Sequence, residues 1–403
     1  MKKILIASTA LVAFGVASAA QASSPIKLEL GGSAQWMVGV ATQKSSFKDG
    51  RDYSSTDVKG NNYLNVNGST VLDNGMKVGV VFLFRAGGNS NTDHNGDPLD
   101  RSYVYLEGRL GKLMVGTVDQ APKILQVTAP DAAGLSEDAG NGIVSGRWVV
   151  SPNMNGRSDF YYLDTTKINT GDASEKIVYY TPKFAGFTLG VGFAPGTSSS
   201  GWSDTGNRDM GTANETYSVG LGYDNTFSGD VRLRAALGWQ FSNQFNGVLS
   251  PGKGGFAHGG ALGGAISGTT DEYNDYNGGI QVSFSGFTIG GGIRYRDIND
   301  SGAWKDVEQL AWSVGVQYAF DKKVVPLTLS LNYYDVESEL KGYTAGSSKK
   351  KDRVHNANLS AKYELGTGVN WISSVGWIDF DSNDDSVKEN EGVVVMTGLG
   401  LAF

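Results

Sequence analysis

The sequence predicts an all-β protein, a 16-stranded antiparallel transmembrane β-barrel, and three observations lead to this fold class. The chain opens with an export signal, and most later segments alternate apolar and polar residues as half-buried strands do. Almost no helical pattern is left to cover the apolar faces. A sheet with such a face can cross a membrane only when it closes on itself, because an open edge would leave backbone groups without partners.

The export signal is predicted at residues 1–22. Two lysines precede an apolar stretch at 4–16, and Ala20-Gln21-Ala22 has the small-residue pattern of a cleavage site. The apolar stretch is too short to span a bilayer comfortably, which argues against a retained anchor. We therefore expect a cleaved signal peptide followed by a single barrel domain at residues 23–403.

Composition excludes several classes of protein. No later stretch has the run of about 18 apolar residues that a membrane-spanning helix needs, so a helical membrane protein is excluded. The chain has no cysteine, which excludes a disulfide scaffold and thiolate chemistry. Its 41 acidic and 34 basic residues argue against nucleic acid as a partner.

Turn signals divide the chain into strands. Seven short turns alternate with eight longer polar connections, which predicts 16 strands with short turns at one rim and long loops at the other. The short turns are expected at 73–75, 110–112, 184–187, 225–230, 285–286, 321–324 and 365–368. The long connections are expected at about 41–60, 88–100, 119–174, 195–213, 244–274, 299–305, 338–352 and 381–390. A soluble β-solenoid or sandwich remains the alternative, although these loop lengths are too irregular for a solenoid.

The alternation assigns a face to each strand residue. In residues 76–85 four apolar side chains share one face while Lys77 and Arg85 share the other, and the closing segment 393–403 has an apolar face that ends on Phe403. Charges confined to one face indicate that this face lines water while the other meets lipid. The arginines predicted to point inward include Arg85, Arg101, Arg109, Arg234 and Arg294.

Three pieces of the chain resemble the general porins of Gram-negative outer membranes. Residues 175–193, EKIVYYTPKFAGFTLGVGF, are similar to a porin strand–turn–strand, and residues 101–119, RSYVYLEGRLGKLMVGTVD, resemble the hairpin before the third loop. The third piece is the terminal Phe403. The resemblance covers the whole mature chain and has one departure, since the family often carries Arg where this chain has Val115-Gly116-Thr117.

The resemblance implies a trimeric, water-filled channel for passive diffusion of ions and small hydrophilic solutes. Such a protein would contact outer-membrane lipid and lipopolysaccharide, and Phe403 would form part of the signal read by the barrel-assembly machinery. Two alternatives stay open, a channel selective for sugars or anions and a closed structural or adhesive barrel. No enzyme is expected, because the three histidines lie in or beside loops and no catalytic constellation is identifiable.

The third long connection, residues 119–174, is far longer than a link between strands requires. Its apolar content indicates that it packs against something, and the resemblance implies that it folds into the lumen. The acids then expected at a constriction are Asp119, Asp131, Glu137 and Asp138. The wall arginines expected opposite them are Arg85, Arg101 and Arg294, with Arg109 and Arg234 nearer the rim of short turns.

Acidic clusters in two other loops suggest one further ligand. Oxygen-rich groups of this kind can bind Ca²⁺, although neither cluster has EF-hand spacing. The clusters are Asp93, Asp97 and Asp100 in one loop, and Asp381, Asp384, Asp385 and Glu389 in another. A solvated acidic rim is the favoured interpretation, and no other cofactor is expected.

Overall fold

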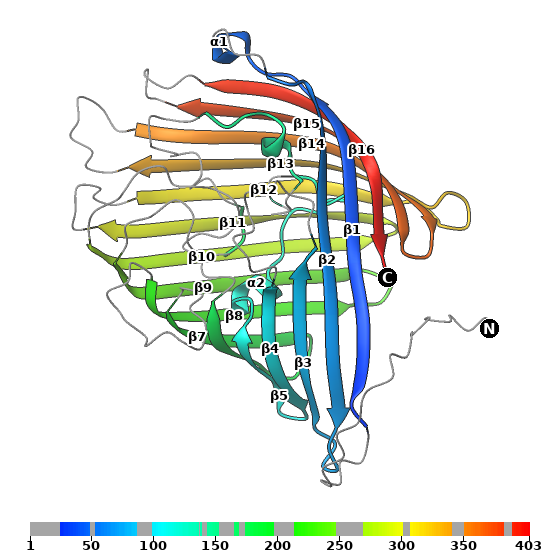
Figure 1. Ribbon diagram of the computed structural model, residues 1–403, viewed down its shortest axis with the longest axis vertical. Helices are drawn as coiled ribbons and strands as arrows, with labels where there is room; N and C mark the ends of the chain where they lie inside the picture. The colour runs from blue at the N-terminus through cyan, green and yellow to red at the C-terminus, as the bar shows by residue number, and fades with distance from the viewer. Residues whose placement is uncertain are drawn as a thin grey trace.

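Sixteen strands close into one antiparallel barrel in the computed structural model (Figure 1). The structure describes residues 25–48, 53–86, 99–136, 138, 143–152, 165–168, 174–196, 213–246, 269–300, 307–340, 350–382 and 389–403. The predicted fold class is confirmed in its strand number and antiparallel order. The expected signal peptide lies outside the described residues.

The strands follow the chain order around the barrel, and each pairs with its neighbours in sequence. They are β1 Lys27–Ala41, β2 Thr56–Val71, β3 Lys77–Arg85, β4 Leu99–Gly108, β5 Gly111–Thr117, β6 Glu175–Tyr180, β7 Phe187–Gly196, β8 Ala213–Thr226, β9 Arg232–Asn246, β10 Thr269–Phe284, β11 Phe287–Asp300, β12 Val307–Ala319, β13 Leu327–Leu340, β14 Lys350–Gly366, β15 Val369–Ser382 and β16 Asn390–Ala402. Short helical segments occur at α1 Ser45–Lys48, α2 Ala121–Leu125 and η2 Ser145–Arg147. In the described part of the chain, no α-helix has the length and apolarity needed to span a membrane.

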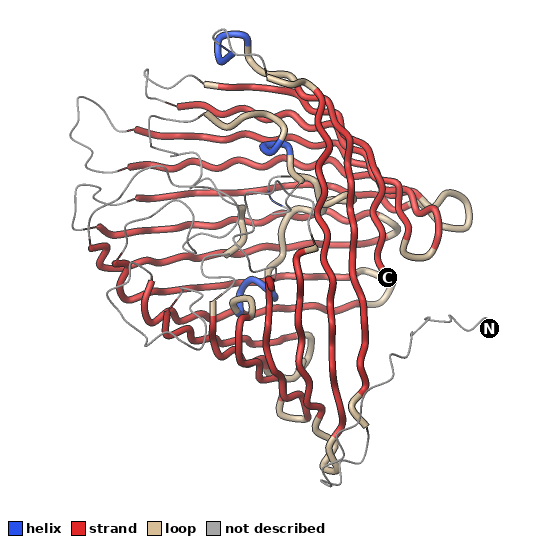
Figure 2. The backbone as a smooth tube through the Cα atoms, viewed as in Figure 1, coloured by secondary structure: helices blue, strands red, loops and turns tan. Residues whose placement is uncertain are grey.

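Each of the seven predicted short turns lies where two consecutive strands join (Figure 2), and four of them, 110–112, 184–187, 225–230 and 365–368, overlap a strand end by one or two residues. A two-residue turn joins β10 to β11 through Ser285 and Gly286, whose φ angles are 47° and 84°. Two residues with positive φ suit the right-handed twist of a hairpin, which explains a glycine here. The barrel closes where β1 pairs with β16, and the N–H and C=O of Gly32 exchange hydrogen bonds with those of Phe403 at 2.9 and 3.1 Å.

The outer wall is apolar, as the alternation predicts. Leu237 on β9 is 65% exposed and Val395 on β16 is 54% exposed, so both side chains would face lipid. Charges do occur outward near the rim of long loops, where Arg353 contacts Asp335 at 3.2 Å. His355 also points outward, with its Nδ1 2.7 Å from Asp335.

The interior contains two packed apolar clusters. The larger joins inward side chains of β1 and β12–β16, such as Met37, Val354 and Met396, to Leu135 and Trp148 of the third long connection. The smaller joins inward residues of β4–β6 to the start of the same connection. Burial of this area removes apolar surface from water inside the barrel, so part of the barrel interior is a core and not open lumen.

Candidate functional site

The third connection begins after β5 and follows the inner wall. Its first helix, α2, contacts β6–β9, and Figure 1 shows it within the ring of strands. Ser218 of β8 donates a hydrogen bond from Oγ to Gln120 Oε1 at 3.0 Å. The hydroxyl of Tyr180 on β6 donates to the carbonyl of Ala121 at 3.3 Å. These contacts fix the start of the connection to one side of the wall.

The connection then passes one strand after another. Gln281 of β10 donates from Nε2 to the carbonyl of Thr128 at 2.7 Å. The backbone N–H groups of Ala129 and Ala132 donate to serine hydroxyls of β12 and β13 at 3.3 and 2.9 Å. Ser145 Oγ donates to Asn358 of β14 at 2.9 Å. Polar inward side chains thus supply partners for a loop backbone that would otherwise be buried without any.

The last described stretch before residue 153 reaches β1 and β2. Trp148 is buried among inward residues, and its carbonyl accepts a hydrogen bond from Gln43 Nε2 at 3.0 Å. Lys59 of β2 places its Nζ 5.0 Å from the centre of the Trp148 ring, within cation–π range. The described residues of the connection therefore contact the inner wall from β6 through β16 to the edge of β2.

Inward glycines let the connection lie directly on the wall. A Cβ at Gly279 would sit 1.8 Å from the carbonyl oxygen of Val127, and a Cβ at Gly220 would sit 2.8 Å from Pro122 Cα. Glycine within a strand marks such close approach of a second backbone. We name these positions the glycine seat: Gly39, Gly190, Gly220, Gly222, Gly238, Gly279, Gly292, Gly315, Gly376 and Gly392.

Five charged side chains meet where the third connection begins, just after β5, and we name them the charge network. They are Arg85, Asp100, Arg101, Asp119 and Lys123. Asp100 lies 3.0 Å from Arg85 and 3.1 Å from Arg101, while Asp119 lies 2.6 Å from Arg101 and 3.2 Å from Lys123. The network joins β3 and β4 to the start of the third connection through alternating charges.

The carboxyl of Asp119 is ionised in this setting. Burial opposes its ionisation, but the positive charges of Lys123 and Arg101, with their hydrogen bonds, outweigh burial and hold the pKa of Asp119 below its ordinary value. Because Arg101 is itself buried, its bonds to Asp119 and Asp100 satisfy a charge that would otherwise be costly.

Arg294 and Asp138 lie away from this network. Arg294 is buried on β11, where it bonds Asp275 at 2.8 Å and donates to the carbonyls of Thr165 and Lys167 at 2.8 and 3.1 Å. Asp138 accepts hydrogen bonds from the N–H and hydroxyl of Thr166 at 2.8 and 2.6 Å. Both side chains bind residues 165–168, the returning part of the third connection.

The remaining predicted residues are also dispersed. Asp131 accepts hydrogen bonds from three N–H groups of its own loop, at 3.1, 2.8 and 2.8 Å, and so stabilises a turn. Arg109 is exposed in the β4–β5 turn, and Arg234 donates to Gln281 at 3.3 Å. Glu137 lies outside the described residues.

Of the predicted charges, the structure brings together only Arg85, Arg101 and Asp119 among the residues it describes. We expected loop acids to face wall arginines across a gap, but Asp119 is in direct contact with Arg101. Sequence reasoning placed Asp100 in an acidic loop cluster and not with the wall arginines, and it missed Lys123. Lys123 stands four residues after Asp119 at the start of a helix, a spacing that brings opposite charges together.

The inward faces of β2–β5, which we name the open sector, differ from the rest of the wall. The side chains of Lys59, Arg85 and Lys112 are 23%, 23% and 36% exposed. Arg85 stacks over Tyr63 at 5.8 Å, and Lys112 stacks over Tyr105 at 4.7 Å. Partly exposed cations on an inward face indicate water in front of them.

No metal site emerges from the described part of the chain, where no three His, Cys, Asp or Glu side chains group suitably. Four acids of the suggested Ca²⁺ clusters, Asp93, Asp97, Asp384 and Asp385, lie outside the described residues. Two others have basic partners, since Asp100 belongs to the charge network and Glu389 lies 3.3 Å from Lys44. The Ca²⁺ suggestion therefore stays untested.

Solved structures share this fold. The anion-selective porin from Comamonas acidovorans is 16% identical, with a TM-score of 0.59 over 94% of this chain and 100% of that one. Outer-membrane expressed OmpT of Vibrio cholerae is 12% identical, with a TM-score of 0.59 over 94% of this chain and 99% of that one. At these identities the likeness shows the fold alone.

Sequence comparison adds the family. No curated protein matches the chain. The family profile described as Gram-negative porin matches residues 7–383, nearly the whole sequence. Together with the closed 16-stranded barrel, this match shows that the chain belongs to the Gram-negative porin family and forms an outer-membrane channel.

Proposed function

We propose that small hydrophilic solutes diffuse through this porin between the open sector and the third connection. The observation that carries the proposal is the difference in exposure between the two parts of the inner wall. Arg294 and Ser218, in the part that the connection covers, are buried, whereas Lys59 and Arg85 in the open sector are partly exposed. A path for water and solutes needs such accessible polar side chains.

The charges beside this path favour anions. Counted among the described residues, the open sector and the adjoining start of the connection carry six basic and four acidic side chains. The basic ones are Lys59, Lys77, Arg85, Arg101, Lys112 and Lys123, and the acidic ones are Asp57, Asp100, Glu107 and Asp119. An excess of positive charge in a narrow aqueous gap raises the local concentration of anions.

Single-channel recording tests both statements. Purified protein in a planar bilayer should conduct, and its reversal potential in a salt gradient should show preference for chloride over potassium. Lys59→Gln together with Arg85→Gln should shift that preference toward cations, whereas Arg353→Gln, on the outer face, should not. A closed structural or adhesive barrel would give no conductance. A channel whose selectivity ignored the open-sector variants would place the path elsewhere.

Assembly and processing of the chain complete the proposal. The in-vitro folded OmpT of Vibrio cholerae was solved in a trimer form, with 11% identity, a TM-score of 0.58 and coverage of 94% of this chain and 100% of that one, which supports a homotrimer here. We propose a mature chain that starts at Ser23 after signal cleavage and contacts lipid and lipopolysaccharide. Crosslinking of the purified barrel and N-terminal sequencing test the trimer and the cleavage site.

Phe403 is proposed as part of the signal for the barrel-assembly machinery. Its backbone exchanges two hydrogen bonds with Gly32 across the closing pair, while its side chain stays exposed. Removal of Phe403 should lower the yield of folded barrel far more than the conductance of the barrels that form. We propose no catalytic activity, because a channel needs none and the family and fold point to a channel.

A further inference from the structure

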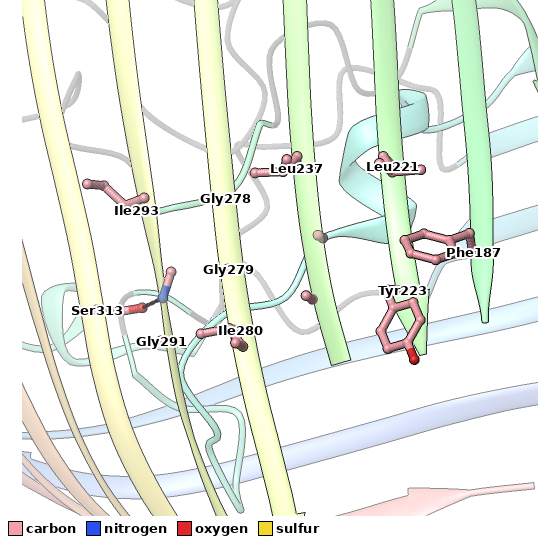
Figure 3. Close-up of a pocket in the computed structure, with 13 residues that line it drawn as sticks. Phe187, Leu221, Tyr223, Leu237, Gly278, Gly279, Ile280, Gly291, Ile293 and Ser313 are labelled. Carbon is pink, nitrogen blue, oxygen red and sulfur yellow. Dashed lines mark hydrogen bonds between the residues drawn. The ribbon is translucent and has the colours of Figure 1, made fainter. Parts of the chain in front are cut away.

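A hollow of about 620 Å³ marks the outer wall of β7–β12 (Figure 3). The large side chains around it include Phe187, Leu221, Tyr223, Leu237 and Ile293. All five side chains point outward from their strands, and the inward-phase residues Ala236, Gly279, Gly292 and Ser313 also line the hollow. The hollow opens on the face that meets lipid, and so it is separate from the solute path inside the barrel.

Small residues at outward positions create the hollow. The pairing register aligns Leu237, Gly278 and Ile293 in one row across β9, β10 and β11. The next row toward the short turns holds Ala235, Ile280 and Gly291. Each row therefore has large side chains beside a glycine or an alanine, which leaves a gap in the row. The gaps of the two adjacent rows join along a diagonal.

We propose that this hollow binds an acyl chain of a phospholipid from the leaflet on the short-turn side. Its lining is apolar, so water filling it would find few hydrogen-bond partners. Left empty, it would forfeit the dispersion contacts that packed apolar groups make. Hydrocarbon is the solvent of this wall, and a flexible acyl chain can follow a diagonal groove between rows of side chains.

The end of the hollow nearest the short-turn rim suits a phospholipid headgroup. Tyr223 lies near the end of β8 at the short-turn rim, where its ring packs on Phe187 at 4.6 Å and its hydroxyl accepts a hydrogen bond from Asn225 at 3.3 Å. An aromatic ring with one polar end belongs at the boundary between hydrocarbon and headgroups. Lys183, exposed in the β6–β7 turn, acts electrostatically on Asp224 of β8, so a cation stands at this rim.

That cation favours a lipid over the wall of a second barrel. The phosphate of a phospholipid is an anion at headgroup level, and an ammonium near the membrane surface attracts it. Arg232, also at this rim, is bonded to Asp224 at 2.6 Å, so we take the exposed Lys183 beside the hollow's β7–β8 end as the proposed phosphate contact. The neighbouring barrel is the competing occupant, and the experiment below separates the two.

The backbone decides which substitutions can fill the hollow. A Cβ at Gly278 would lie 3.2 Å from Leu237 Cδ2, the end of a flexible side chain that can shift. A Cβ at Gly291 would lie 2.1 Å from the carbonyl oxygen of Ser313, and this backbone atom is held in the sheet and cannot shift. Ala235→Leu and Gly278→Leu are therefore the filling variants. Ala357→Leu, outward on β14 beside Trp377, is the matched control.

Native mass spectrometry tests the proposal. Delipidated, folded protein is titrated with dipalmitoyl phosphatidylethanolamine, dipalmitoyl phosphatidylglycerol and, as the uncharged probe, dipalmitoylglycerol. The native chain and Ala357→Leu should bind one phospholipid per barrel, and each filling variant should bind at least fivefold more weakly. Lys183→Gln should weaken both phospholipids and leave dipalmitoylglycerol unchanged.

Two results would overturn the proposal. One is equal phospholipid binding by all variants, each checked for folding by its heat-modifiable mobility in SDS. The other is unchanged lipid binding with loss of the oligomer in the filling variants, which would assign the hollow to a second copy of the chain. Because Ala235→Leu and Gly278→Leu are tested singly, failure of one to fold leaves the other decisive.

Discussion

The two parts of the inner wall are built from different residues. Where the third connection lies on the wall, inward positions include many glycines, serines and apolar side chains, such as Gly279, Ser313 and Val354, and the charged ones, such as Arg294, are buried. In the open sector they include long charged and aromatic side chains that stay partly exposed, such as Lys59, Tyr63 and Arg85. A loop backbone needs room and hydrogen-bond partners, whereas a solute path needs charges that water can reach.

This difference shows that the size of the inward side chains determines where the third connection can lie and where the lumen stays open. Glycine on the wall lets a second backbone approach to contact distance, and long side chains keep it away. The charge network marks the boundary between the two parts, because Asp119 and Lys123 belong to the connection while Arg85 and Arg101 belong to the wall. The four predictions below test this contrast, from the largest expected effect to the smallest.

Gly279→Val should disturb the barrel most. Its Cβ would fall 1.8 Å from the carbonyl oxygen of Val127, so the connection has to leave the wall there. We expect a loss of about 3 kcal/mol or more, the upper range for overpacking, together with altered conductance. Urea unfolding of the folded barrel in micelles measures the loss. Gly68→Val is the control, since a Cβ there meets nothing closer than 3.5 Å, and equal destabilisation of the two variants would refute the glycine seat.

Trp148→Ala should release the far end of the connection. The side chain is buried in the larger apolar cluster, which also holds Met37 and Met396, and truncation of a buried tryptophan costs about 3–5 kcal/mol. The variant should unfold at lower urea and show larger, noisier single-channel currents, because the freed segment no longer lies on the wall. Trp371→Ala, on the exposed outer face, should change neither the currents nor the midpoint strongly. Native-like currents for Trp148→Ala would contradict this.

Arg101→Ala should alter selectivity with a smaller loss of stability. It removes one positive charge beside the path and leaves Asp119 with Lys123 as its remaining cation in the charge network. We expect a wider pore, a reversal potential shifted toward cations and a loss of about 1–3 kcal/mol, below the range for a fully buried ion pair because Asp119 is partly exposed and keeps Lys123. Arg101→Lys should keep the native preference, and Asp119→Asn should move it toward anions. Unchanged reversal potentials across the three variants would locate the constriction elsewhere.

Acidification between pH 8 and about pH 5 should have the smallest effect on stability and on the reversal potential. The depressed pKa of Asp119 means that its contribution to stability is complete above the ordinary pKa of an aspartate, about 3.9, and is lost as the pH falls through the depressed value. The part of the reversal potential that depends on Asp119 should thus stay constant between pH 8 and about pH 5 and change only under strong acid. Asp119→Asn serves as the reference. A difference between native and variant channels that vanished near pH 5 would show that Asp119 is not held by Arg101 and Lys123.

The sequence alone predicted a large part of the barrel because a strand displays its two faces locally. Alternation with a period of two assigns each side chain to lipid or interior, and turn residues such as Asn74-Gly75 and Ser285-Gly286 mark where a strand must reverse. The strand number, the seven short turns and the outward face that ends on Phe403 needed only these local signals.

Contacts between residues far apart in the sequence could not be predicted from these local signals. Arg101 and Arg294 share the same phase and chemistry in the sequence, yet one joins the charge network and the other binds the returning loop at Thr165. Asp131 and Asp119 also differ, since Asp131 accepts hydrogen bonds mainly from its own turn while Asp119 forms an ion pair with a wall arginine. Which charge lines a path depends on where the third connection runs.

The sequence by itself determined a closed, lipid-facing barrel, because alternation and turns act over a few residues. Only the tertiary structure decided how the interior is divided. Gly279 and Val127 are far apart along the chain, and the reason for a glycine at the first position appears only when the two segments touch. The inward apolar residues Met37, Val354 and Met396 likewise make sense only once Trp148 covers them, because burial is a property of the whole fold and not of any one strand.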